Sequence, residues 1–295
     1  MKDPEEKEMM AYIAGLIDGD GHIGIRRFSA GLKPLVQLFN SIRQMPEYLN
    51  RIFDGTVAFD KPKKEGNRIV WKWMLQGKEG CRTFLEKVVQ YLVLKKDSAI
   101  EVLEFLNSPV DGKDYYQSSK NLNLNRKIEQ VNLDDVERKI CEDSFFWAYV
   151  AGIMDTDGSF SIERAVRKPT YDNRQKNDLI KYRPKILLSM VSERSIRFIL
   201  ENCPFGNVHI IKANTALRGS AFRFCISARG EAIEFLKRCV PYLQTKAIQA
   251  IKLLNFCRAY VPTNGLAKVP EKEIEFRESC YKEIVRLNNT PSLGE

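Results

Sequence analysis

Two segments of this 295-residue chain repeat one another. Residues 11–21 read AYIAGLIDGDG and residues 148–158 read AYVAGIMDTDG, with seven identities in eleven positions at an offset of 137 residues. Internal repeats indicate homologous structural units that place the same elements in the same order. We therefore predict two related halves, each organised around one copy of this segment.

Features downstream of each copy also repeat in order, at offsets of 150 or 151 residues. The offset changes chiefly between Arg27 and Lys33, which predicts a longer loop in the second copy at about residues 164–182. The matched features are Lys33-Pro34 with Arg183-Pro184, Ser41 and Arg43 with Ser192 and Arg194, Trp71-Lys72-Trp73 with Phe222-Arg223-Phe224, and Tyr91, Leu92 and Lys95 with Tyr242, Leu243 and Lys246.

Hydrophobic periodicity predicts one order of elements for both halves: a helix, two strands, a helix, a two-stranded hairpin and a final helical pair. The predicted halves are residues 1–108 and 144–295, and the polar residues 109–143 form a linker that is partly helical near Asp134–Cys141. The strongly charged segment Pro270–Leu287 is expected to be a solvent-facing helix. After the repeated segment, the elements are His22–Phe28, Leu35–Ser41, Pro46–Phe53, a hairpin turning at Lys61–Asn67, Lys78–Tyr91 and Lys95–Asn107, with counterparts Ser159–Arg164, Ile186–Val191, Glu193–Asn202, a hairpin turning at Lys212–Gly219, Gly230–Leu243 and Lys246–Tyr260.

Small residues form a stripe along each repeated helix. Ala11, Gly15 and Gly19 are spaced by four residues and share one helical face, and Ala148, Gly152 and Thr156 repeat the stripe. Glycine inside a helix costs about 1 kcal/mol relative to alanine, so its repeated use requires a packing reason. Each helix could pack on its own sheet, but we favour close packing of the two helices on one another as a pseudo-twofold interface.

Acidic residues end both helices. Asp18, Asp20, Asp155 and Asp157 lie at the carboxyl end, where the helix dipole is unfavourable for a negative charge. Paired helices would also bring Asp20 and Asp157 together, and their repulsion raises a pKa or requires a cation. A magnesium ion held by both acids would relieve both penalties and suit attack of water on a phosphodiester. A single motif of this kind could be a simple turn, but the presence of two copies of the motif favours the metal site.

Composition narrows the class of partner. The chain has 47 basic and 38 acidic residues, a net charge of +9, which makes a polyanion plausible. The amino terminus lacks the features of a secretory or transit signal, and the apolar run Phe145–Met154 is too short for a membrane span. Seven cysteines without a CxxC pair and only two histidines argue against a zinc site and fit a reducing compartment.

The segments Ile13–Gly21 and Val150–Gly158 resemble the motif of the LAGLIDADG homing endonucleases, specifically the single-chain type with two motif copies. The resemblance extends from about Glu8 to Tyr260. It implies an α+β fold in which two pseudo-symmetric αββαββα halves form an antiparallel β saddle over DNA, with the motif helices packed at the centre. It also implies a monomeric, metal-dependent, site-specific endonuclease that cuts both strands across the minor groove and leaves 3′ overhangs.

The resemblance assigns roles to particular residues. Asp20 and Asp157 are the expected catalytic metal ligands, and Lys95 and Lys246 are expected near the scissile phosphate, to orient water or to stabilise charge. Asp18 and Asp155 are expected to brace the helix pair. The remaining assignments are Gly19 and Thr156, at the motif's variable position beside the metal site, and Ser41 and Ser192 as polar helpers, with Arg43 and Arg194 close by.

Alternation along the strands predicts a DNA-reading face that enters the major groove. The predicted readers are His22, Gly24, Arg26 and Lys72 in the first half and Ser159, Ser161, Glu163 and Arg223 in the second, opposite core-facing Ile23, Ile25, Phe160 and Ile162. The predicted phosphate contacts are Lys61, Lys63, Lys64 and Arg68, with Arg167, Lys168, Arg174 and Lys176. Because the readers differ between halves, the expected target is long double-stranded DNA that is only loosely palindromic.

The sequence is compatible with three functions. The leading one is an endonuclease encoded within an intron, using Mg²⁺ at a site that Mn²⁺ or Ca²⁺ could also occupy. The others are an RNA maturase that binds intron RNA and assists splicing without cleavage, and a non-catalytic DNA-binding regulator. Retention of both terminal acids and both lysines favours the nuclease. We expect no membrane association, no secretion, and a location in a mitochondrion, a chloroplast or the prokaryotic cytoplasm.

Overall fold

The computed structural model describes residues 4–29, 31–60, 69–108, 136–167, 179–211, 221–259 and 269–289. Each half contains one four-stranded antiparallel sheet, ordered β1-β2-β4-β3 in the first half and β5-β6-β8-β7 in the second. The first half comprises α1 (Pro4–Asp20), β1 (Gly21–Phe28), β2 (Gly31–Asn40), α2 (Gln44–Phe53), β3 (Thr56–Asp60), β4 (Val70–Gln76), α3 (Lys78–Val88) and α4 (Lys96–Asn107).

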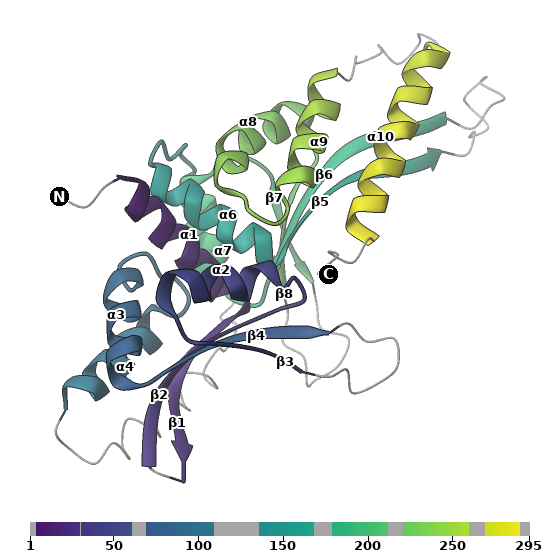
Figure 1. Ribbon diagram of the computed structural model, residues 1–295. Helices are drawn as coiled ribbons and strands as arrows, with labels where there is room; N and C mark the ends of the chain where they lie inside the picture. The colour runs from purple at the N-terminus through teal and green to yellow at the C-terminus, as the bar shows by residue number, and fades with distance from the viewer. Residues whose placement is uncertain are drawn as a thin grey trace.

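The second half repeats this order and adds one helix. It comprises α6 (Ser144–Thr156), β5 (Gly158–Arg167), β6 (Leu179–Met190), α7 (Glu193–Asn202), β7 (Asn207–Ile211), β8 (Ala221–Ile226), α8 (Arg229–Cys239), the 3₁₀ turn η1 (Val240–Tyr242), α9 (Ala247–Ala259) and α10 (Glu271–Asn289). The two αββαββα units confirm the predicted fold class. Figure 1 places α1 and α6 side by side, with the two sheets extending away from them.

Strand register separates a core face from an outward face in each sheet. Ile23 opposes Val36 across β1 and β2, and Phe160 opposes Ile186 across β5 and β6. All four side chains are buried. The intervening residues therefore point away from the helices, as the alternation predicts.

Glycine allows the two central helices to touch backbone to backbone. A Cβ added at Gly15 would lie 2.1 Å from the carbonyl oxygen of Tyr149, and one added at Gly152 would lie 2.1 Å from that of Tyr12. No side chain larger than hydrogen fits at either position. The predicted packing of α1 on α6 is thus confirmed, and the alternative of two separately packed helices is wrong.

Three expectations need correction. Residues 136–143 are not helical; instead Lys139 and Cys141 donate backbone hydrogen bonds to the end of α7. Helix α10 is not simply solvent-facing, because it lies along β5 (Figure 1) and buries Arg277 and Ile284. The insertion at residues 164–182 is partly strand, since β5 continues to Arg167 and β6 begins at Leu179.

No helix in the described ranges is both long enough and apolar enough to cross a membrane.

Candidate active site at the ends of the paired helices

The terminal acids of the two motif helices lie close enough for the charge of Asp157 to act on Asp20. Asp20 is the last residue of α1, and Asp157 caps the end of α6. Burial and the negative charge of Asp157 raise the pKa of Asp20 to about 6. Asp157 is exposed to solvent, but partial desolvation by the surrounding groups also raises its pKa, opposed by the positive charges of Lys246 and Lys95. The helix pairing thus brings together the two acids that the sequence places 137 positions apart.

A neighbouring amide distinguishes the first acid from the second. The Nδ2 group of Asn40 donates to Asp20 Oδ2 at 2.9 Å, which lowers the pKa that burial raises. Met190 occupies the equivalent position in the second sheet. Asn40 pairs with Trp71 in the first sheet, and Met190 pairs with Phe222, the counterpart of Trp71, in the second. Sequence reasoning chose the adjacent Ser41 instead. The available signal was alternation, since Val36, Leu38 and Asn40 share the core face.

Both predicted lysines hold the carboxyl ends of the motif helices. Lys95 Nζ donates to the carbonyl oxygens of Ile17 at 2.6 Å and Asp18 at 2.7 Å, and to that of Gly19 at 3.3 Å. Lys246 Nζ donates to Met154 at 2.9 Å, Thr156 at 2.8 Å and Gly158 at 2.7 Å. The last carbonyls of a helix lack intrahelical partners, and a cation there also complements the dipole.

The first acid of each motif braces the turn before the lysine of its own half. Asp18 accepts hydrogen bonds from the backbone N–H groups of residues 93, 94 and 95, at 2.7–2.9 Å. Asp155 accepts them from residues 244, 245 and 246, at 2.7–3.3 Å. Each also accepts a tyrosine hydroxyl from the other half: Tyr149 on Asp18 and Tyr12 on Asp155. The sequence analysis missed these tyrosines, although they recur at one position of the repeat.

Gly19 and Thr156 face one another across the helix interface. A Cβ at Gly19 would lie 2.0 Å from Thr156 Oγ1, so the threonine fills the space that the glycine leaves. The Thr156 hydroxyl donates to the Ile153 carbonyl at 2.8 Å in its own helix. These two residues therefore determine how the helices pack beside the acids.

The donor set suits a hard divalent cation. Two carboxylates whose ionisation is opposed by desolvation lie at the ends of the paired helices, and oxygen is the ligand atom that Mg²⁺ and Ca²⁺ prefer. Among the described residues, no group of three or more His, Cys, Asp or Glu side chains could by itself hold a metal ion. A cation here would need further oxygen ligands from water or phosphate.

The predicted DNA readers lie on the outward faces of the two sheets. Arg26 and Arg223 are exposed, whereas His22, Lys72, Ser159 and Ser161 are partly buried. Arg223 opposes Ser189 and His209 on the neighbouring strands, and the Ser161 hydroxyl donates to the Lys185 carbonyl at 3.2 Å. Glu163 keeps the same alternation, whereas Gly24 is buried between Ile23 and Ile25 and does not lie on the outward face as predicted.

The predicted arginines after the second strand of each half contact groups other than the terminal acids. Ser41 is exposed and Ser192 precedes α7 without capping it through its side chain. Arg43 pairs with Glu47 at 2.6 Å and lies over the Trp71 ring, and Arg194 pairs with Asp97 at 2.8 Å. The predicted phosphate contacts Lys61, Lys63, Lys64, Arg68, Lys168, Arg174 and Lys176 lie outside the described residues, and of Arg167 only the backbone is described.

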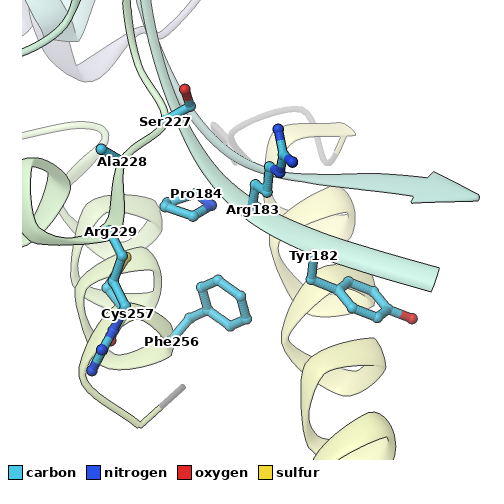
Figure 2. A pocket seen from close by; sticks show the side chains of 8 residues that line it. All are labelled: Tyr182, Arg183, Pro184, Ser227, Ala228, Arg229, Phe256 and Cys257. Atoms are coloured by element: carbon cyan, nitrogen blue, oxygen red, sulfur yellow. The ribbon is translucent and has the colours of Figure 1, made fainter. Parts of the chain in front are cut away.

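A cavity of about 340 Å³ lies in the second half, and no residue of α1 or α6 is among those that line it (Figure 2). Part of its wall is tied together by Arg229, whose Nε donates to the Cys257 carbonyl at 2.6 Å. No residue assigned to cleavage lines it. The lining residues are Tyr182, Arg183, Pro184, Ser227, Ala228, Arg229, Phe256 and Cys257.

Known proteins resemble this chain in sequence and in fold. The intron-encoded DNA endonuclease aI3 of Saccharomyces cerevisiae is 29% identical over 157 residues, which span 51% of this chain and only 35% of that protein. No family model matches the chain. Two solved structures match nearly the whole chain: the I-LtrWI LAGLIDADG homing endonuclease bound to target DNA, and I-SmaMI bound to uncleaved DNA with calcium ions.

The first of these structures has a TM-score of 0.62 at 14% identity, and covers 97% of this chain and 98% of its own. The second has a TM-score of 0.60 at 13% identity, with the same coverage. Each of these two structural matches therefore extends over both halves of the chain. The chain has the two-domain fold of the LAGLIDADG homing endonucleases.

Proposed function

We propose that this protein is a site-specific endonuclease that hydrolyses both strands of double-stranded DNA with a divalent metal, leaving 3′ overhangs. The observation that carries the proposal is the meeting of Asp20 and Asp157 at the ends of two paired helices, where the charge of one raises the pKa of the other. Such a pair is unfavourable without a cation and suited to one. The similarity to DNA-bound endonucleases and to an intron-encoded relative supports the same activity.

Each half would supply the groups for one strand. Asp20 and Asp157 would hold Mg²⁺, with the carbonyls at Gly19 and Thr156 beside them. The bound cation supplies Lewis-acid polarisation of the phosphate and activation of water for in-line attack. Lys95 and Lys246 would keep the helix ends, and therefore the acids, in place, and put positive charge near the reacting phosphate.

The outward sheet faces would bind the target. Lys72, Arg26 and Arg223 would contact phosphates or bases, and His22, Ser159 and Ser161 would read base edges. Arg43, Ser41, Ser192 and Arg194 would flank the cleavage centre, and Arg68 would contact phosphate. Because the two faces carry different residues, the target would be long and asymmetric, bound by one monomeric chain.

The resemblance to an intron-encoded protein suggests the genetic setting. We propose that this chain too is encoded in an intron, and acts in an organelle or in a prokaryotic cytoplasm.

The test is selection of cleaved molecules from a randomised duplex library with Mg²⁺. The wild-type chain should enrich one asymmetric sequence, and Asp20→Asn should lose double-strand cutting of it while retaining binding. Asp54→Asn is the matched control, because it makes the same isosteric change at an exposed position that ends α2.

Unchanged double-strand cutting by Asp20→Asn would remove this residue from the reaction. A wild-type protein that enriches no cleaved duplex would refute the nuclease. If that protein also bound structured intron RNA tightly, it would be reassigned as a maturase.

A further inference from the structure

Two buried tyrosine–aspartate hydrogen bonds cross between the halves. Tyr12 of α1 donates to Asp155 of α6 at 2.8 Å, and Tyr149 of α6 donates to Asp18 of α1 at 2.9 Å. The two tyrosines occupy one position of the repeated segment, and the two aspartates occupy another. The same contact is therefore made twice across the pseudo-twofold axis.

Each tyrosine ring is fixed by its own half. The Tyr12 ring packs edge-on against Tyr48 of α2 at a centroid distance of 6.0 Å, and the Tyr149 ring packs against Phe198 of α7 at 5.4 Å. Tyr12 also approaches the sulfur of Met45 at 3.7 Å, a weaker acceptor than a carboxylate. The hydroxyls are thus held in place and directed at the other half.

Each aspartate joins that hydroxyl to a turn of its own half. Asp18 accepts the Tyr149 hydroxyl and three consecutive backbone N–H groups that end at Lys95. Asp155 accepts the Tyr12 hydroxyl, three consecutive N–H groups that end at Lys246, and the Thr245 hydroxyl at 3.0 Å. A carboxylate has about four acceptor positions. The tyrosine is one of four donors to Asp18 and one of five donors to Asp155.

The turn in question fixes the lysine that holds the helix end. Lys95 begins its reach to the α1 carbonyls from the turn that Asp18 anchors, and Lys246 reaches the end of α6 from the turn that Asp155 anchors. The chain of contacts therefore runs from a tyrosine in one half to a helix end and its terminal acid in the other.

We propose that Tyr12 and Tyr149 are positioning residues that act across the interface. Tyr12 orients Asp155 and through it the turn that carries Lys246, and Tyr149 orients Asp18 and the turn that carries Lys95. Each cleavage centre is then completed by the opposite half. The catalytic consequence rests on the proposed endonuclease function, whereas the positional consequence does not.

The positional consequence is measured by amide hydrogen exchange on the full chain, without metal or DNA. Tyr12→Phe should accelerate exchange at residues 244–246 roughly tenfold, because a hydrogen bond to a charged buried group is lost, and should leave residues 93–95 unchanged. Tyr149→Phe should give the reverse pattern. Helix α3 serves as an internal reference for global stability, and Tyr48→Phe is the control, since it removes a hydroxyl from the adjacent ring and should alter neither turn.

The catalytic consequence is measured on the duplex recovered by selection, with a different label on each strand. Asp157→Asn and Asp20→Asn identify the strand that each half cuts. Tyr12→Phe should slow, by roughly tenfold, cutting of the strand that depends on Asp157, and Tyr149→Phe should slow cutting of the strand that depends on Asp20. The double variant should slow both strands.

Equal acceleration of both turns, or of neither, in each single variant would overturn the inference. Slowing of the same strand by both variants would also overturn it. A wild-type protein that cuts no duplex would refute the proposed function alone, because the crossed exchange pattern would still decide the tyrosine roles.

Discussion

At the scale of single residues, ionisation of Asp20 is opposed from two sides. Burial removes water from the carboxylate, and the charge of Asp157 repels it, so its pKa lies near 6 instead of 3.8. The folded chain therefore binds a proton between about pH 4 and pH 6 that the unfolded chain has already released. A site that disfavours its own charge in this way is suited to a cation.

This shift gives the metal-free protein a pH-dependent stability with a definite sign. Because the folded state binds more protons than the unfolded state, stability falls as pH rises through about 4 to 6. We expect Asp20→Asn to be more stable than the wild type by about 1–2 kcal/mol at about pH 7.5, and equal to it below about pH 4. Urea unfolding in EDTA across this range measures the difference, with Asp54→Asn as the control. A gain that does not vary with pH would contradict the assigned cause.

Asn40 lowers the pKa of the same carboxyl by donating to it. Replacing Asn40 with Met gives the first half the residue that occupies this position in the second, and removes the donor. We expect the pKa of Asp20 to rise by about one unit, since a hydrogen bond to a charged group is worth about 1.5 kcal/mol or more. Carbon-13 NMR titration of the Asp20 carboxyl measures this shift. Ser41→Ala, at the exposed neighbour, should leave the titration unchanged; an equal effect would favour the polar role predicted for Ser41.

At the scale of elements, the pairing of α1 with α6 depends on two glycines that have no room for a Cβ. Gly15→Ala would place a methyl group 2.1 Å from the carbonyl oxygen of Tyr149. Neither helix can move to relieve this clash without disturbing the terminal acids. We expect a loss of about 3 kcal/mol or more in the free energy of unfolding, measured by chemical denaturation. Gly230→Ala in α8 is the matched control, because nothing lies within 4 Å of its added Cβ. It should be neutral or stabilising, and a comparable loss there would point to helix propensity rather than packing.

The elements that could be predicted are those that the repeat specifies twice. The small-residue stripes predicted the helix pair, and alternation predicted the core faces of β1 and β5. Helix α10 is predicted, but its docking is not, because its charge content obscures an apolar stripe at Phe276, Cys280 and Ile284, which is spaced by four residues and packs on the second half. A charged helix can still be docked when one face is apolar.

The site was predictable only where local sequence defines it. The motif acids and lysines recur in both halves, so the repeat identified them. The crossed contacts of Tyr12 and Tyr149 join residues 143 and 131 positions apart. Such contacts depend on how two helices are rotated about one another, which residue spacing in either half does not determine.

At the scale of the whole molecule, the halves share a buried frame but differ on their outward sheet faces. If these faces bind the duplex, replacing a basic side chain there with a neutral one should weaken binding and also reduce the salt dependence of binding. The reason is that each phosphate contact releases condensed counterions. We expect Arg223→Gln, at an exposed position of β8, to reduce the slope of log K against log salt by about one unit, measured by fluorescence anisotropy on a mixed-sequence duplex. Lys272→Gln on α10 removes a charge that is also exposed, from the helical side, and should leave the slope unchanged. An equal change in both variants would mean that net charge, and not the sheet face, governs binding.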